Sequence, residues 1–148
     1  MASGPADRVA RVRLAVVSLA ALTAAAAAAG CGGSDTKVLF PSACANPTYK
    51  PPQIIVTCAD ANTVVRGITW KSYGDKTADG SGTANVNACD PNCAAGRFQM
   101  FPAAVKLSAP EDCAKDSAQF THLVMTYTGA QPAAGGSTIQ EDFPCKGP

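Results

Sequence analysis

Acid–base chemistry in this chain has few candidate side chains: one histidine and two pairs of adjacent carboxylates. His122 could serve a Ser-His-Asp triad, but no Gly-x-Ser-x-Gly turn accompanies it, and a strand pattern surrounds it. The pairs Glu111-Asp112 and Glu141-Asp142 could act in a glycosidase only if two carboxyl groups faced each other across a cleft. Adjacent residues in surface loops rarely do so. We therefore expect no catalytic residues and expect these carboxylates to be solvated.

Calcium and zinc sites are both disfavoured by the spacing of the available ligands. Asp75, Asp79 and Gly80 match the first, fifth and sixth positions of an EF-hand loop, but the third position is Thr77 and the twelfth is Val86 instead of glutamate. A zinc site would need cysteines beside the single histidine, and cysteines in an oxidising compartment form disulfides. Turn formation explains the acidic residues of this stretch, so we expect no metal and no cofactor.

Seven cysteines are present, and six of them lie in the body of the chain: Cys44, Cys58, Cys89, Cys93, Cys113 and Cys145. An even number predicts three disulfides, each stabilising by about 2–4 kcal/mol. Fifteen pairings are possible. We expect Cys44–Cys58, Cys89–Cys93 and Cys113–Cys145, which would close three surface loops between strands. Three residues instead of two separate Cys89 from Cys93, which disfavours a thioredoxin-like redox pair.

The first thirty residues have the order of an export signal. Arg8, Arg11 and Arg13 precede an apolar run at 14–29. This run is shorter than the roughly 18–20 residues that span a bilayer, which favours a cleavable signal peptide over a retained helix. Ala28-Ala29-Gly30-Cys31 resembles the bacterial lipobox. The resemblance implies cleavage before Cys31 and attachment of palmitate or a similar acyl group, which would anchor the protein on the extracytoplasmic face of the cell membrane.

We therefore expect a signal peptide at 1–30, a lipidated cysteine and polar tether at 31–37, and one disulfide-stapled domain at 38–148. Without residues 1–30 the chain has 118 residues, enough for one domain with a small core. Its formal charge is then −1, because the first thirty residues hold three of the twelve basic and one of the eleven acidic residues. That balance indicates neither nucleic acid nor an anionic lipid surface as a partner.

β-Branched runs and alternating patterns predict strands at 53–58, 63–70, 83–87, 101–107 and 120–128. Asp79-Gly80-Ser81-Gly82 predicts a turn. Pro102 predicts an edge strand or a bulge. The segment 108–118 is the one place that favours a short helix, with Ser108 as its cap and Pro110 in its first turn. The pattern favours a mainly β fold, a small antiparallel β-sandwich or barrel stapled by three disulfides.

Three short motifs stand out within residues 51–128: Cys58-Ala59-Asp60-x-Asn62, Trp70-x-x-Tyr73-Gly74 and Asn87-x-Cys89-x-Pro91-x-Cys93-Ala94-x-Gly96. Together they resemble a pattern that recurs in small secreted proteins and lipoproteins of high-GC Gram-positive bacteria (actinobacteria). The resemblance implies a location and a fold, and it implies no particular activity.

Four residues of these motifs are candidate ligand contacts. Asp60 and Asn62 can form an Asx turn after a strand, and Trp70 and Tyr73 lie close to a chain reversal. Exposed aromatic rings beside polar amides would suit a carbohydrate or peptide groove. The alternative is that Trp70 is the single large anchor of the core.

These observations favour a lipid-anchored envelope protein whose domain binds or has a structural role without catalysis. The partners expected are the membrane, through Cys31, and an envelope protein or glycan, with no nucleic acid. One alternative is a protein-directed inhibitor that presents the loop from Cys89 to Phe98. Another is a hydrolase, which would need His122 in a cleft with a carboxylate neighbour. A binding groove should expose Trp70 and Tyr73 together, whereas an inhibitor should project the loop.

Overall fold

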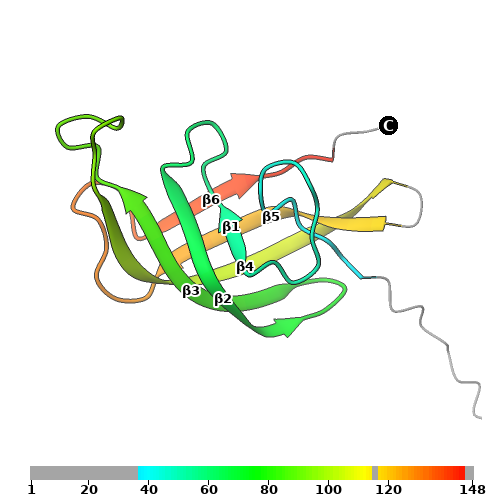
Figure 1. Ribbon diagram of the computed structural model, residues 1–148. Coiled ribbons are helices and arrows are strands. Elements are labelled where there is room, and N and C mark those ends of the chain that lie inside the picture. The colour runs from blue at the N-terminus through cyan, green and yellow to red at the C-terminus, as the bar shows by residue number, and fades with distance from the viewer. Residues whose placement is uncertain (1–36, 115–116, 146–148) are drawn as a thin grey trace, which may run out of the picture. The chain divides into compact units, whose positions relative to one another are not determined.

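The computed structural model describes residues 37–114 and 117–145, which belong to one compact unit, Gly33–Pro148. Six strands follow one another as neighbours in a single antiparallel sheet that curls into a half-barrel (Figure 1). They are β1 (Gln53–Ile55), β2 (Thr63–Tyr73), β3 (Ala78–Asn87), β4 (Phe98–Ala114), β5 (Ser117–Tyr127) and β6 (Thr138–Asp142). The predicted mainly β class is confirmed, with one curled sheet as its architecture. The predicted signal peptide and Cys31 lie outside the described residues.

All three predicted disulfides are present. Cys44–Cys58, Cys89–Cys93 and Cys113–Cys145 have Cα–Cα distances of 5.6, 3.8 and 5.1 Å. The first joins the segment before β1 to the β1–β2 connection. The second closes part of the β3–β4 connection, and the third ties the end of β4 to the segment after β6. Of the three disulfides, Cys113–Cys145 therefore ties an outer segment to a strand, and the other two hold segments outside the strands.

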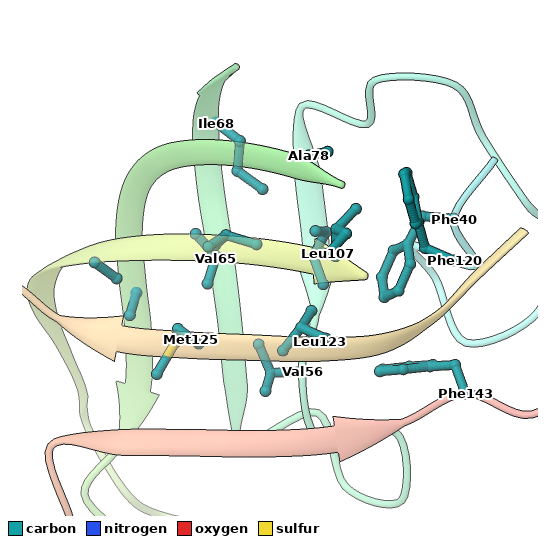
Figure 2. Close-up of a cluster of buried hydrophobic side chains, with 14 of the residues drawn as sticks. Phe40, Val56, Val65, Ile68, Ala78, Leu107, Phe120, Leu123, Met125 and Phe143 are labelled. Carbon is teal, nitrogen blue, oxygen red and sulfur yellow. The ribbon is translucent and has the colours of Figure 1, made fainter. Parts of the chain in front are cut away.

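The core covers the inner face of the curled sheet (Figure 2). Alternate residues of β4, from Phe101 to Leu107, are buried, as the period of two predicts. Leu123, Met125 and Tyr127 of β5 are buried in the same way. At one end of this core lie three phenylalanines, Phe40, Phe120 and Phe143; the rings of Phe40 and Phe143 are edge to face, 4.9 Å apart.

The segment before β1 occupies part of the sheet edge. Leu39 forms a parallel bridge with Gln119 of β5, beyond the point where β6 ends. The Leu39 N–H donates to the Ala118 carbonyl at 2.9 Å, and the Phe120 N–H donates to the Leu39 carbonyl at 2.9 Å. Because of these hydrogen bonds, the backbone of β5 stays paired where β6 no longer covers it.

Two irregularities in β2 let unevenly spaced side chains reach the same face. The pairing of β2 with β3 shifts between Arg66 and Thr69 and again between Trp70 and Ser72. Gly67 has a φ of +62°, a conformation typical of a glycine β-bulge. Val65, Ile68, Trp70 and Tyr73 consequently all pack on or against the core, although strict alternation would separate them.

The turn predicted at 79–82 is wrong, because these residues lie inside β3. Gly80 and Gly82 are needed there for close approach to β2. A Cβ atom at Gly80 would lie 2.8 Å from the Trp70 ring, and one at Gly82 would lie 2.7 Å from the Arg66 carbonyl oxygen. The actual reversal is at 74–77, where the Gly74 N–H donates to the Thr77 carbonyl. Glycines that usually mark turns here make room for the neighbouring strand.

The helix predicted at 108–118 is also wrong. This segment is the end of β4 and the start of β5, with Pro110 paired to Phe120 and Glu111 to Gln119. Cross-strand hydrogen bonding outcompetes the weak helix signal of a cap and a proline. β6 was not predicted, because its residues Thr-Ile-Gln-Glu-Asp include a single large apolar side chain.

The edge position predicted from Pro102 is wrong for the strand as a whole, since β4 lies between β3 and β5. It holds locally. The Pro102 carbonyl accepts a hydrogen bond from Thr128, just past the end of β5, and the pairing of β4 with β5 begins only at Ala103. The proline nitrogen therefore faces a place where no ladder hydrogen bond is required.

We expect Gly82→Ala to lower the free energy of unfolding by about 1–3 kcal/mol, because the added methyl group meets backbone of β2 that cannot move aside. Gly136→Ala is the control, since a Cβ atom there has its nearest neighbour 3.7 Å away. Urea denaturation of both variants measures the difference. Equal stability of the two variants would contradict the close packing of β3 on β2.

Candidate functional site

Trp70 and Tyr73 lie together, but their rings are turned against the core. Their ring centroids are 4.9 Å apart and nearly perpendicular, and Tyr73 also contacts Phe120 at 5.7 Å. The Trp70 indole N–H donates to the Pro51 carbonyl at 3.0 Å. Both side chains are half-buried. This arrangement favours a packing role over an open stacking platform for a sugar or peptide.

The Tyr73 hydroxyl is buried and has no hydrogen-bond partner within the described ranges. Burial raises the pKa of Tyr73 to about 12, and the nearby Lys50 backbone opposes only part of that shift. The exposed neighbour Tyr49 packs edge to face on Tyr73, with Lys37 and Lys50 ammonium groups 5.5 and 5.3 Å from its ring centroid. The phenol of Tyr73 is therefore neutral at physiological pH.

Asp60 and Asn62 form the predicted Asx turn. The Asp60 carboxylate accepts hydrogen bonds from the Asn62 backbone N–H at 3.0 Å and from the Asn62 side chain at 2.6 Å. The first of these bonds is the main reason that the pKa of Asp60 is lowered. The Asn62 side-chain oxygen accepts a hydrogen bond from Asn87 at 3.0 Å. Both residues thus support the start of the β3–β4 connection.

Asn87 is the centre of that connection, and sequence reasoning missed its role. Its side-chain NH₂ also donates to the Cys93 carbonyl at 2.8 Å, and its side-chain oxygen accepts from the Cys89 N–H at 3.0 Å. A Cβ atom at Gly96 would overlap this oxygen. The loop folds tightly around Asn87, which explains the spacing Asn87-x-Cys89-x-x-x-Cys93-x-x-Gly96.

Further hydrogen bonds complete the loop between β3 and β4. The Ala88 N–H donates to the Arg97 carbonyl, and the Ala95 N–H donates to the Asn92 side chain, both at 2.9 Å. All side chains from Asp90 to Ala95 are nevertheless exposed. The loop is therefore both ordered by internal bonds and accessible, which is the state that a preformed binding loop requires.

Two large apolar side chains lie on the outer face of β4, directly after this loop. Phe98 is 57% exposed and Met100 is 73% exposed. Phe98 also lines a shallow hollow of about 470 Å³ beside Ile55 and Val64. We call Phe98, Met100 and the loop 89–97 the tip surface. The alternation that buries Phe101 implies that 98 and 100 point outward, so the sequence did contain a signal for this patch.

The single histidine has a carboxylate neighbour. His122 Nδ1 lies 2.7 Å from Asp142 Oδ1 across the β5–β6 pair, and Ser108 of β4 is the register partner of His122 on its other side. These three residues lie on the outer face, and the Asp142 side chain is 81% exposed. No hydrogen bond joins Ser108 to His122 in residues 37–114 and 117–145. These three side chains lie open to solvent, whereas the residues of a catalytic triad lie in a site from which water is excluded.

The other predicted carboxylates are on strands instead of the expected loops. Glu111 and Asp112 are exposed near the end of β4, and Glu141 is half-buried on β6 beside Asp142. Asp79 accepts a hydrogen bond from the Ser72 hydroxyl at 3.3 Å. Within the described part of the chain, no three histidine, cysteine or acidic residues are grouped closely enough to hold a metal ion.

Asn87→Ala should loosen the loop, because it removes three side-chain hydrogen bonds at once. We expect a loss of about 1–3 kcal/mol in the free energy of unfolding and faster amide hydrogen exchange across 88–97. The matched control is Asn85→Ala on the same strand, which removes one bond to the Thr83 carbonyl. Unchanged exchange in the Asn87 variant would show that the disulfide alone orders the loop.

Comparison of the chain with protein-family models, with curated proteins and with solved structures finds no match. Within the residues that the structure describes, no helix is long and apolar enough to cross a membrane.

Proposed function

We propose that this chain is a lipid-anchored protein of the cell envelope whose domain binds a partner protein through the tip surface, without catalysis. One observation supports this proposal above the others: among the described residues, Phe98 and Met100 are the most exposed large apolar side chains, and they adjoin a loop already held in one conformation. Exposed apolar side chains gathered beside a rigid loop are typical of protein interaction sites.

The position of the tip surface agrees with anchoring through Cys31. The described chain begins at Lys37, and Leu39 is bridged to Gln119, which pairs with Glu111 of β4. Phe98 is thirteen residues away along the same strand, about 40 Å at the usual rise per residue. The β3–β4 loop and the start of the described chain are at opposite ends of the sheet (Figure 1). A tether at one end would therefore present the other end to partners.

A protein partner fits this surface better than a glycan does. Sugars are bound by flat aromatic faces beside hydrogen-bonding groups, and the aromatic pair Trp70–Tyr73 is engaged with the core. Phe98 and Met100 instead offer large and adaptable apolar contacts, which suit an apolar pocket on a protein. The order of the loop 89–97 favours an inhibitor as the second candidate, with the loop entering the site of an envelope enzyme.

Anchoring is tested by Cys31→Ser. The variant should lose incorporation of an alkyne-labelled palmitate, and it should either remain uncleaved or be released from the membrane, because the acceptor thiol is gone. Ser34→Ala, in the same short stretch, should retain the label. Recovery of normally processed and membrane-bound Cys31→Ser protein would refute lipid anchoring at this residue.

The tip surface is tested by site-specific crosslinking in intact cells. A photoreactive benzoylphenylalanine at position 98 or 100 should give a discrete adduct with one protein, since these side chains point outward. Position 106 is the matched control, because Lys106 is exposed on the same face of the same strand. Adducts that are equal at 100 and 106, or that are missing at 98 and 100, would contradict a protein partner at the tip.

A further inference from the structure

A groove lies at the end of the sheet opposite the tip surface, where β6 stops and the segment 38–40 takes over the pairing with β5. Its volume is about 440 Å³, within the range of sites for small ligands. Leu39, Pro41, Ala45, Ala118 and Phe143 are among its lining residues. We call it the disulfide groove, because the cysteines of two disulfides also line it.

Each wall of the disulfide groove is tied by a disulfide to another part of the domain. Cys44–Cys58 fixes the wall formed by 41–47, and Cys113–Cys145 fixes the wall formed by the segment after β6. Behind the groove, Phe40 and Phe143 pack edge to face in the core. An apolar groove would normally shrink as its walls move together, and two disulfides oppose that movement.

The polar groups of the groove are few and differ in kind. Gln119 is only 7% exposed, and its side-chain NH₂ donates to the Phe143 carbonyl at 3.4 Å. Its side-chain oxygen accepts no hydrogen bond from residues 37–114 or 117–145, so it can accept one from a ligand hydroxyl. Asp142 is the one charged residue among the described lining residues. A negatively charged head group is therefore disfavoured, and a neutral hydroxyl-bearing one is favoured.

We propose that the disulfide groove binds one long acyl chain of a neutral membrane lipid, such as a monoacylglycerol. The source of the lipid follows from the short sequence distance between the groove residue Leu39 and Cys31. Leu39 lines the groove, and only five residues lie between Cys31 and Lys37, so the reach from one to the other is about 20 Å even when this stretch is fully extended. If Cys31 is lipidated, as the proposed function holds, the groove is kept close to the bilayer that supplies such chains.

The test uses residues 31–148 with Cys31→Ser, purified oxidised and without detergent, so that no acyl group of its own is present. Nile red should fluoresce when it binds the groove, and 1-monopalmitoylglycerol should displace it at micromolar concentration. Palmitate should displace it several-fold less well, because its carboxylate would lie near the negative charge of Asp142 at the exposed rim of the groove, where the Asp142 side chain is hydrogen-bonded to His122. Asp142→Asn should reduce that difference.

Two tryptophan variants in one exposed loop provide the matched comparison. Ala45→Trp places an indole in the groove and should weaken displacement by monopalmitoylglycerol at least tenfold, whereas Ala43→Trp adds the same ring outside the lining and should change it less than twofold. Equal effects of the two variants, or no displacement in the unsubstituted chain, would overturn the proposal. Because the Cys31→Ser protein used in this test carries no lipid anchor, a negative result here leaves the anchoring test and the tip-surface test unaffected.

The lipidated protein in vesicles distinguishes the source of the chain. Added photoreactive monoacylglycerol should label residues of the groove wall, such as those at 39–47. If labelling occurs in the Cys31→Ser chain but not in the lipidated protein, the groove holds the chain's own acyl group, and the assignment to a membrane lipid is overturned.

Discussion

In residues 37–114 and 117–145, one sheet has an apolar face and no second layer packs on it, so the sheet must cover that face itself. The sheet does so by curling, and the curl depends on side-chain size. Between 78 and 84 the inner face of β3 carries only alanine and glycine, at Ala78, Gly80, Gly82 and Ala84, and Val86 packs against the core at the end of the strand. Larger side chains of β2 and β4 can therefore approach one another across it. The bulges of β2 bring Ile68 and Trp70 to that inner face.

Curling alone leaves the two ends of the core open, and the chain closes them by different means. Near the start of the described chain, Phe40, Phe120 and Phe143 fill the end, and two disulfides hold the segments that carry the first and last of them. At the other end, Phe101 and Tyr127 pack edge to face at 5.7 Å. The β3–β4 loop there is held by Asn87 and a disulfide rather than by apolar packing. At that end, Phe98 and Met100 consequently remain exposed on the outer face of β4.

Local patterns were sufficient to predict the parts of this fold that depend on nearest neighbours. The alternation at 101–107, the strand at 120–128 and the Asx turn at Asp60 all depend on short-range spacing. The cysteine count predicts three disulfides, but their pairing is one of fifteen possibilities, and Cys113–Cys145 joins residues 32 apart. The sequence predicts a turn at Gly80 and Gly82 because the reason that glycine is needed there, the closeness of Arg66 and Trp70, lies on another strand. The sequence does not predict β6 or the pairing of the segment 38–40, because both depend on β5 and not on the composition of these segments themselves.

In the candidate site, too, local sequence predicts the turn that a residue forms but not which residues of other strands it contacts. Asp60 and Asn62 were chosen as ligand contacts because of their chemistry, yet their hydrogen bonds go to each other and to Asn87. The sequence allows Trp70 to be either a ligand contact or a core anchor, and its hydrogen bond to Pro51 and its ring packing against Tyr73 are those of an anchor. Polar residues whose hydrogen bonds are spent within the fold have little capacity left for a ligand. What remains available is the apolar surface that no strand covers. In the described part of the domain that surface is divided between the tip surface and the disulfide groove, whose walls are each tied down by a disulfide.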